Sequence, residues 1–416
     1  MPSERKAIIG ATVIDATGAL PLRGATVLVE GERIIAVGQD VRIPEDAERI
    51  DAAGKHLLPG LIDSHVHVTA PDYLPSAIKG SREAYMTLIA MRNLRSALQA
   101  GITTVRDVCG PPINLALRTA LRCGDLVGPR LYTAGVGICM TGGHGSGFEG
   151  SAHEVDGQDA VRKAVRTERK AGVDLIKLLT SHRTEHPEFT QPEIDAGVDE
   201  AHRHGLPVAI HAANFATTKM ASIAGVDTIE HGSFIDEETA DRMAEKDIAL
   251  VPTLWVKYDL AERLTRWQQT PSEYPWGDAR DLAEAAAWFR GCAERLPRTL
   301  DIVRSRGIRI AAGTDFVMND HPWALLPEEM EWLTRLGLSP MEAIVSATRV
   351  GAEILGIEGD LGTVEPGKLA DMILIDSDPL ADIGVLKNVR WVMQSGHVVP
   401  RSPEWDRRAI RDHIVL

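Results

Sequence analysis

The chain has 416 residues, of which 44% are hydrophobic and 25% charged, so it carries enough apolar material for a large core. Acidic residues outnumber basic ones by 59 to 45, and the net charge of -14 argues against nucleic acid or an anionic membrane surface as a partner. The sequence contains no basic tract and no run of about 18 apolar residues, so it predicts neither a polybasic anchor nor a membrane-spanning helix.

The first residues and the cysteines both favour the cytoplasm. Residues 1–6 run directly into a β-like stretch at 7–14, without the apolar core of a signal peptide. Because the four cysteines are far apart and form no CxxC pair, we expect free thiols rather than a disulfide framework: Cys109, Cys123, Cys139 and Cys292.

Both ends of the chain have the pattern of short antiparallel strands. Residues 25–29 and 33–38 are rich in β-branched side chains and flank a turn, and residues 370–375 and 389–399 repeat this texture. Each end has roughly 55 residues, which is little for a core of its own, so we expect the two ends to pair. The sequence therefore predicts a composite β-sandwich domain built from residues 1–58 and 365–416.

The middle of the chain, residues 59–364, alternates strand and helix patterns. The predicted strands are residues 57–67, 103–107, 130–134, 175–179, 208–211, 228–231, 249–252 and 309–315. The predicted helices are residues 82–100, 158–171, 191–204, 216–224, 237–246, 279–305 and 327–336, and most of them end at a glycine. This α/β pattern predicts a (β/α)8 barrel of the TIM type rather than a doubly wound sheet, because candidate ligands recur from the first strand to the last.

Two long insertions follow predicted strands. Residues 135–154 are rich in glycine, and residues 255–278 carry five aromatic side chains. Long loops on the active face of a barrel usually shape the substrate pocket, and we expect these two to do so.

Side chains that bind metals stand at the ends of five predicted strands. His65 and His67 are two residues apart, so both leave the same face of a strand. The carboxyl ends of successive strands converge in a barrel, and a buried lysine or aspartate is costly unless it is paired or ligated. One shared metal site would account for the whole set, which is His65, His67, Lys177, His211, His231 and Asp315.

Several of these segments resemble one known family. The run LPGLIDSHVH at residues 58–67 resembles the first-strand signature of the amidohydrolase superfamily, and IEHG at 229–232 and AGTD at 312–315 are similar to its later metal and acid–base strands. GTVEPGKLAD at 362–371 resembles the return into its β domain. The likeness covers essentially the whole chain and is closest to the imidazolonepropionase-like branch, which includes metal-dependent dipeptidases and ochratoxin-type amidohydrolases.

The resemblance implies a binuclear centre with two divalent ions, Zn²⁺ or otherwise Mn²⁺, Co²⁺ or Fe²⁺. His65, His67 and Asp315 would hold the more buried ion. Lys177 would bridge both ions as a carbamate formed with CO₂, since an ammonium has no lone pair to offer. His211 and His231 would hold the second ion. A bridging hydroxide would attack the substrate carbonyl while Asp315 takes its proton and passes it to the leaving nitrogen.

Four further residues are candidates for contact with substrate. His144 lies in a glycine-rich motif, TGGHG at 141–145, that is similar to one in the family, and we expect it to donate to the substrate carbonyl. Tyr258 resembles a tyrosine that contacts substrate in related dipeptidases, with one extra residue in the register. Arg183 offers a bidentate contact to a substrate carboxylate, and His321 follows the last strand, where related sequences often carry a histidine. A structural role in loop or lid is the alternative for each.

The leading hypothesis is hydrolysis of an amide bond in a dipeptide or an N-acyl amino acid. Hydrolysis of a cyclic amide or lactone and hydrolytic deamination are enzymatic alternatives, although Lys177 weighs against a mononuclear deaminase. A non-catalytic scaffold is a third reading, against which the complete ligand set weighs. We expect a small-molecule amide or peptide as the partner, and a homo-oligomer is compatible with the sequence.

Overall fold

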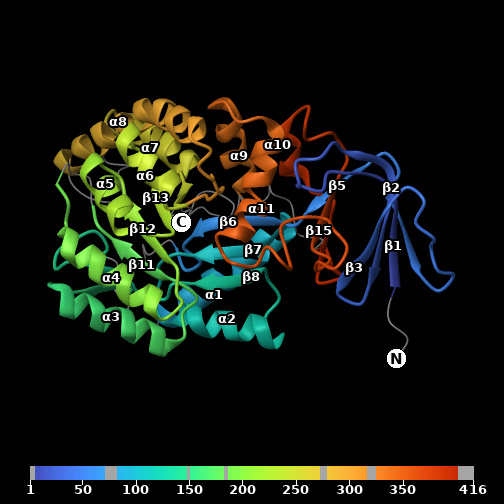
Figure 1. Cartoon of the computed structure of the whole chain (residues 1–416), viewed down its shortest axis with the longest axis horizontal. Coiled ribbons are helices and arrows are strands. Elements are labelled where there is room, and N and C mark those ends of the chain that lie inside the picture. The colour runs from blue at the N-terminus through green and yellow to red at the C-terminus, as the bar shows by residue number, and fades with distance from the viewer. Residues whose placement is uncertain are drawn as a thin grey trace.

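The computed structural model describes residues 5–70, 82–147, 150–181, 186–271, 279–315 and 325–401 (Figure 1). Two of the predicted substrate residues, Arg183 and His321, lie outside the described residues. Among the helices of the described part, none combines the length and the apolar character that a membrane span requires.

Strands from both ends of the chain share one sheet at one end of the molecule (Figure 1). Its order is β17-β16-β15-β5-β1-β2-β3, with β4 pairing β1. β5 and β15 pair antiparallel, with Leu57 opposite Leu374, which joins the two ends in one layer. The domain boundaries at residues 58 and 365 remain predictions. The bounds are β1 Arg5–Val13, β2 Leu22–Glu30, β3 Arg33–Gly38, β4 Glu48–Asp51, β5 His56–Pro59, β15 Met372–Ile375, β16 Trp391–Gln394 and β17 His397–Val398.

The middle of the chain forms two parallel sheets. One has the order β6-β7-β8 and the other β10-β9-β11-β12-β13-β14. Their strands are short and mostly buried along their whole length, as is typical of parallel strands covered on both faces. The bounds are β6 Leu61–Val66, β7 Ile102–Asp107, β8 Arg130–Thr133, β9 Gly137–Cys139, β10 Ala152–Glu154, β11 Ile176–Leu179, β12 Val208–Ala212, β13 Thr228–His231 and β14 Ala249–Val251.

Backbone hydrogen bonds link these two sheets beyond their named strands. The amide of Ala311 donates to Leu250 in β14, and the amide of Ser64 in β6 donates to Ala312, both at 2.9 Å. On the other side, Asp174 donates to Thr133 in β8 at 2.9 Å. The predicted strand at 309–315 thus lies between β14 and β6, although its only ladder pairing in the described part is the bridge of Ile310 with Leu250.

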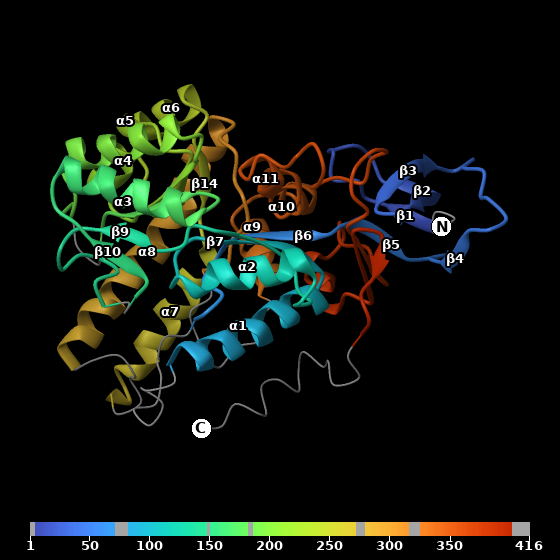
Figure 2. The same ribbon diagram turned by 90° about the horizontal axis from the view of Figure 1, so that it is seen from below.

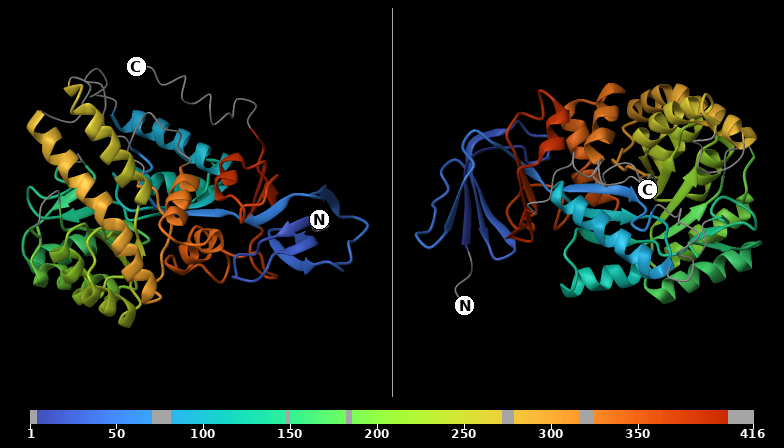
Figure 3. Two further views of the ribbon diagram at one scale, coloured as in Figure 1. Left: turned by 90° about the horizontal axis from the view of Figure 1, so that it is seen from above. Right: turned by 180° about the vertical axis from the view of Figure 1, so that it is seen from behind.

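Helices cover the parallel strands on the outside. In Figures 1 and 2, α1 and α2 lie on one side of β7, and α3 to α6 follow one another beside the larger sheet. In Figure 3, α7 and α8 run side by side. The bounds are α1 Arg82–Gln99, α2 Ile113–Cys123, α3 Gln158–Ala171, α4 Gln191–Arg203, α5 Phe215–Ala224, α6 Glu237–Glu245, α7 Leu254–Trp267, α8 Ala279–Ser305, α9 Leu326–Arg335, α10 Pro340–Ser346, α11 Arg349–Glu353 and the 3₁₀ helix η3 Ile383–Asn388.

Three details of the predicted elements are wrong. Residues 57–67 form two strands rather than one, because β5 joins the terminal sheet and β6 the parallel one. The change occurs at Gly60, where a Cβ would lie only 2.3 Å from the hydroxyl of Thr103. The aromatic insertion at 255–278 is predicted as a loop, but it begins as helix α7. Two of its aromatic side chains, Trp255 and Trp267, pack into the main core. The insertion at 135–154 contains β9 and β10.

Candidate metal centre

Five histidines from the ends of β6, β12 and β13 and from the glycine-rich loop form a continuous group of ring contacts. The ring centroids of His65 lie 5.4 Å from His67 and 5.0 Å from His231. His211 continues the group at 4.4 Å from His231, and His144 lies 4.2 Å from His211. The rings belong to residues up to 166 positions apart, so they meet because the fold brings the ends of β6, β12 and β13 together, and not because of local sequence.

Asp315 faces this group with both carboxylate oxygens. Oδ1 lies 3.3 Å from Nε2 of His67 and 3.5 Å from Nε2 of His65, and Oδ2 lies 3.7 Å from Nδ1 of His231. One ligand atom each from His65, His231 and Asp315 falls within 4.8 Å of the others, a spacing that could hold a metal ion. Burial opposes the charge of Asp315, but the neighbouring histidines outweigh it and hold its pKa well below the usual range.

The hydrogen bonds of His65 and His67 direct one nitrogen of each ring toward Asp315. Nδ1 of His67 lies 2.8 Å from the carbonyl oxygen of Cys109, which can only accept, so this nitrogen carries the proton. Nδ1 of His65 lies 2.6 Å from the Glu230 carboxylate. In the neutral form of each ring, Nε2 would therefore have the lone pair that a metal requires, which is the arrangement that ligating histidines usually have.

Glu230 belongs to a buried charge network that sequence reasoning missed. Its Oε2 faces His65, and its Oε1 accepts from Arg106 at 2.7 Å and from Thr228 at 2.5 Å. Arg106 also donates to the carbonyl of Ser64 at 2.5 Å. Burial acts to raise the pKa of Glu230, yet Arg106 and His65 lower it to about 2. The network fixes the tautomer and orientation of His65, and its only signal in the sequence is a charged residue inside each of two apolar strands.

Lys177 lies beside this network in β11. Its side chain is 2% exposed, and Lys177 stands opposite Ala209 of β12 in the parallel register. Burial lowers the pKa of Lys177, although the negative charge of Glu230 acts in the opposite direction. The lowered pKa favours the neutral amine. Burial likewise lowers the pKa of His211 and His231 well below the ordinary value, so both are neutral imidazoles, the form that binds metal.

Three of the residues with positive φ that are not glycine lie at this centre. They are His231 at 71°, Thr253 at 48° and Asp315 at 49°. The hydroxyl of Thr253 lies 2.7 Å from Nδ1 of His231, and the amide of Asp315 donates to the carbonyl of His65 at 2.8 Å. Left-handed backbone costs roughly 1–3 kcal/mol at such residues and persists where the surroundings impose it, most often at functional sites.

Asp63 fixes the segment that carries Asp315. Its two oxygens accept from the amide and the hydroxyl of Thr314 at 3.0 and 2.8 Å. Burial raises the pKa of Asp63 to about 7, and through these hydrogen bonds the carboxyl is joined to the last predicted strand. The first parallel strand, β6, is thereby joined to the segment at 309–315, next to the candidate metal ligands.

Helix α7 brings a lysine to the centre and keeps the predicted tyrosine away from it. Nζ of Lys257 lies 3.8 Å from Oδ2 of Asp315, and only 6% of the residue is exposed. Tyr258 instead donates its hydroxyl to the carbonyl of Ala293 at 3.1 Å and stacks its ring on Trp332 at 3.8 Å. The described contacts of Tyr258 are thus to helices α8 and α9, and the structure does not bring it to the histidines.

His144 reaches the centre from the glycine-rich loop, as its ring contact with His211 shows. Its backbone amide donates to Glu188 at 2.8 Å, which ties this loop to the segment after β11.

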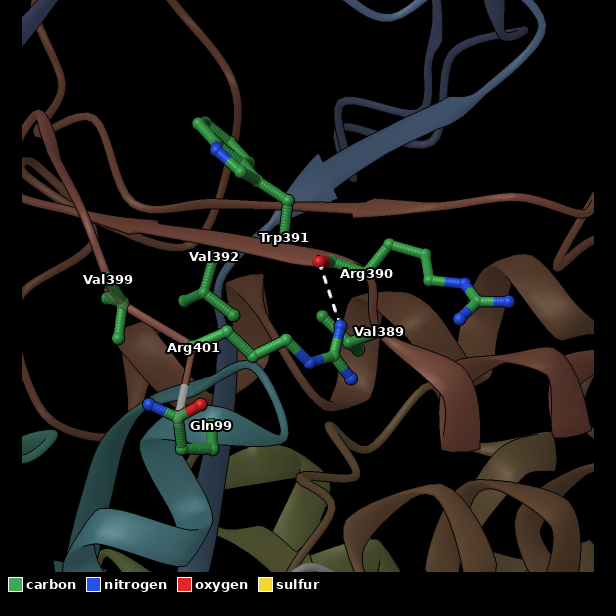
Figure 4. A pocket seen from close by; sticks show the side chains of 7 residues that line it. All are labelled: Gln99, Val389, Arg390, Trp391, Val392, Val399 and Arg401. Carbon is green, nitrogen blue, oxygen red and sulfur yellow. Dashed lines mark hydrogen bonds between the residues drawn. The ribbon is translucent and has the colours of Figure 1, made fainter. Parts of the chain in front are cut away.

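A small surface pocket of about 10 Å³ lies elsewhere, where the guanidinium of Arg401 donates to the carbonyl of Arg390 at 2.9 Å (Figure 4). This pocket has space for about one water and none of the centre's residues line it, so it is no substrate site.

Comparisons with known proteins agree with this geometry. The family described as "Amidohydrolase family" matches residues 56–399. The chain is 30% identical over 410 residues to the ochratoxinase of Aspergillus niger, across 89% of this chain and 81% of that protein. It is 24% identical over 400 residues to the imidazolonepropionase of Pseudomonas aeruginosa, across 86% and 89%. A solved structure of a Xaa-Pro dipeptidase with methionine bound in its active site superposes with a TM-score of 0.84 at 31% identity, covering 95% of this chain and 100% of that one.

Proposed function

The chain belongs to the amidohydrolase family, whose members hydrolyse C–N bonds and generally use metal ions, and from this premise we propose that it is a binuclear metal-dependent hydrolase of amide bonds in dipeptides or N-acyl amino acids. The observation that carries the proposal is the convergence of His65, His231 and Asp315 within 4.8 Å, with Lys177 buried beside them. The likeness to an ochratoxinase and to a Xaa-Pro dipeptidase supports an amide bond as the target.

The proposal includes the architecture that holds the site. The two parallel sheets would close into a (β/α)8 barrel through the segment at 309–315, which hydrogen-bonds to both β14 and β6. Residues 1–58 and 365–416 would form the composite β domain, supported by the pairing of β5 with β15.

The donor set fits two divalent ions. His65, His67 and Asp315 would hold one ion, and the neutral imidazoles of His211 and His231 would hold the other, as suits Zn²⁺, Mn²⁺ or Co²⁺. The lowered pKa of Lys177 favours the free amine, which is the form that reacts with CO₂ to give a bridging carbamate.

Ions bound there would supply a water of lowered pKa and polarise the substrate carbonyl. Asp315 would accept the proton of the attacking water at Oδ2, since its Oδ1 faces His65 and His67. The same oxygen would then deliver the proton to the leaving nitrogen. His144, whose ring touches His211, would donate to the carbonyl oxygen.

A metal analysis combined with a substrate panel tests the proposal. The enzyme should hold about two divalent ions, lose turnover of dipeptides and N-acyl amino acids on chelation, and regain it with Zn²⁺, Mn²⁺ or Co²⁺. His231→Asn should lose metal, whereas His202→Asn, which alters an imidazole bonded to Asp227 away from the centre, should keep it. An active enzyme without metal would overturn the proposal, and turnover of lactones or cyclic amides alone would redirect it.

A further inference from the structure

Lys257 is a buried cation next to the candidate metal centre. It stands in the first turn of α7, where the positive end of the helix dipole disfavours a positive charge. Two amides at the adjoining helix end already have a partner, because those of Leu254 and Trp255 donate to the carboxyl of Glu329 at 2.9 and 2.7 Å. Burying an ammonium is costly unless it is matched by a partner, so its position calls for one.

The partners of Lys257 within the described residues are incomplete. Asp315 lies at ion-pair distance, 3.8 Å, which is too long for a hydrogen bond, and the ring of Phe289 has its centroid 5.6 Å from Nζ. An ammonium carries three donors, and among the residues that the structure describes none of the hydrogen bonds comes from Nζ of Lys257. Asp315 does not depend on it, since His65 and His67 already meet the other carboxylate oxygen.

We propose that the ammonium of Lys257 binds a carboxylate of the substrate, located one carbon from the scissile nitrogen on the leaving side. This inference rests on the proposed function, in which Oδ2 of Asp315 delivers a proton to that nitrogen. To receive the proton, the leaving nitrogen must lie within about 3 Å of Oδ2 of Asp315. The carboxylate oxygens of an amino acid lie roughly 3 Å from its nitrogen, so they can come within hydrogen-bonding distance of an ammonium next to Oδ2. The favoured substrates would therefore release a free amino acid.

Binding of two product-like probes to the metal-loaded enzyme tests this assignment without turnover. L-phenylalanine and 2-phenylethylamine differ only in the carboxylate, and calorimetric titration gives the affinity of each. The wild type should prefer L-phenylalanine, and Lys257→Met should reduce that preference by ~10 to 100-fold, as expected for a charge-assisted hydrogen bond. Lys257→Gln is a second variant that removes the charge, and Lys257→Arg should retain part of the preference.

Lys219→Met is the matched control, because Lys219 pairs with Glu238 on an exposed surface and should leave the preference unchanged. A wild type without preference, a Lys257→Met enzyme that keeps it, or an equal loss for both probes would overturn the inference. Turnover of N-acetyl-L-phenylalanine separates the two proposals. If the enzyme does not hydrolyse this compound but still binds L-phenylalanine in preference to 2-phenylethylamine, and Lys257→Met removes that preference, the hydrolysis of N-acyl amino acids is refuted. The carboxylate site at Lys257 would then still be supported.

Discussion

Replacing Glu230 by Gln should weaken both the fold and the metal centre, because this one carboxylate meets a buried arginine on one side and a ligand histidine on the other. Oε1 accepts from Arg106 at 2.7 Å, and Oε2 lies 2.6 Å from Nδ1 of His65. Gln keeps the volume of the side chain, so the substitution removes charge rather than packing. It leaves the guanidinium of Arg106 buried without its counter-ion.

The loss in the free energy of unfolding can be estimated in two ways. Burial opposes the charge of Glu230, yet Arg106 and His65 lower its pKa from 4.5 to about 2, which corresponds to roughly 3 kcal/mol of stability at neutral pH. Removing one partner of a buried ion pair costs ~3–5 kcal/mol. Because the folded pKa lies below the unfolded one, this stability is present above about pH 5 and is lost as the pH falls toward 2.

Urea unfolding of the metal-free protein at pH 7 measures the loss. Glu238→Gln is the control, since Glu238 also pairs with cations, Lys219 and Arg242, but at an exposed site, and it should leave the free energy of unfolding nearly unchanged. Metal affinity of Glu230→Gln should also fall ~10 to 100-fold, because His65 loses the partner that fixes its tautomer. The double variant with Arg106→Met should recover part of the stability and none of the metal affinity.

A Glu230→Gln protein as stable as the wild type would refute the account of a buried charge network. Unchanged metal affinity with the expected loss of stability would restrict Glu230 to the fold. The two measurements thus separate its bond to Arg106 from its bond to His65.

Three further substitutions test other parts of the site. Asp315→Asn should lower kcat by ~10² to 10⁴-fold while most metal remains, and loss of both ions by elemental analysis would contradict its acid–base role. Lys177→Ala should lose at least one ion and regain some turnover with short carboxylic acids; two ions with normal turnover would exclude the bridge. Burial raises the pKa of Glu329 to about 8, above its unfolded value, so the wild type should lose stability as the pH rises from 5 to 9. Calorimetry should find a flatter profile for Glu329→Gln, and equal slopes would contradict this.

The sequence predicts the parallel core well, because its strands are apolar runs and its helices have clear ends. The predicted helices at 158–171 and 279–305 have the same bounds as α3 and α8, and the predicted strand at 228–231 is β13. α3 ends at Gly172 with φ of 87°, the left-handed stop that a glycine permits. The candidate ligands follow from the same pattern, since strand ends on one edge of parallel strands must meet.

The charge network was beyond sequence reasoning for a different reason. Arg106 and Glu230 are 124 residues apart, and each alone is a polar residue in a strand that otherwise looks fully buried. Their pairing depends on how the two parallel sheets bring β7 and β13 near each other, which hydrophobic pattern and turn signals do not specify. The same holds for Asp63, whose partner Thr314 is 251 residues away.

Tyr258 lies away from the histidines because of a difference of one residue of register. Successive side chains on a helix are about 100° apart, so Lys257 and Tyr258 cannot both point at Asp315. A loop at 255–278 would have left either side chain free to reach the site, but α7 fixes the choice, because Tyr258 is held by Trp332 and Ala293. With the carboxyl of Glu329 holding the first amides of α7, the helix start and therefore its rotation are set by α9. The side chain that faces Asp315 is thus selected by a carboxyl group 72 residues beyond it, at a site that no local motif identifies.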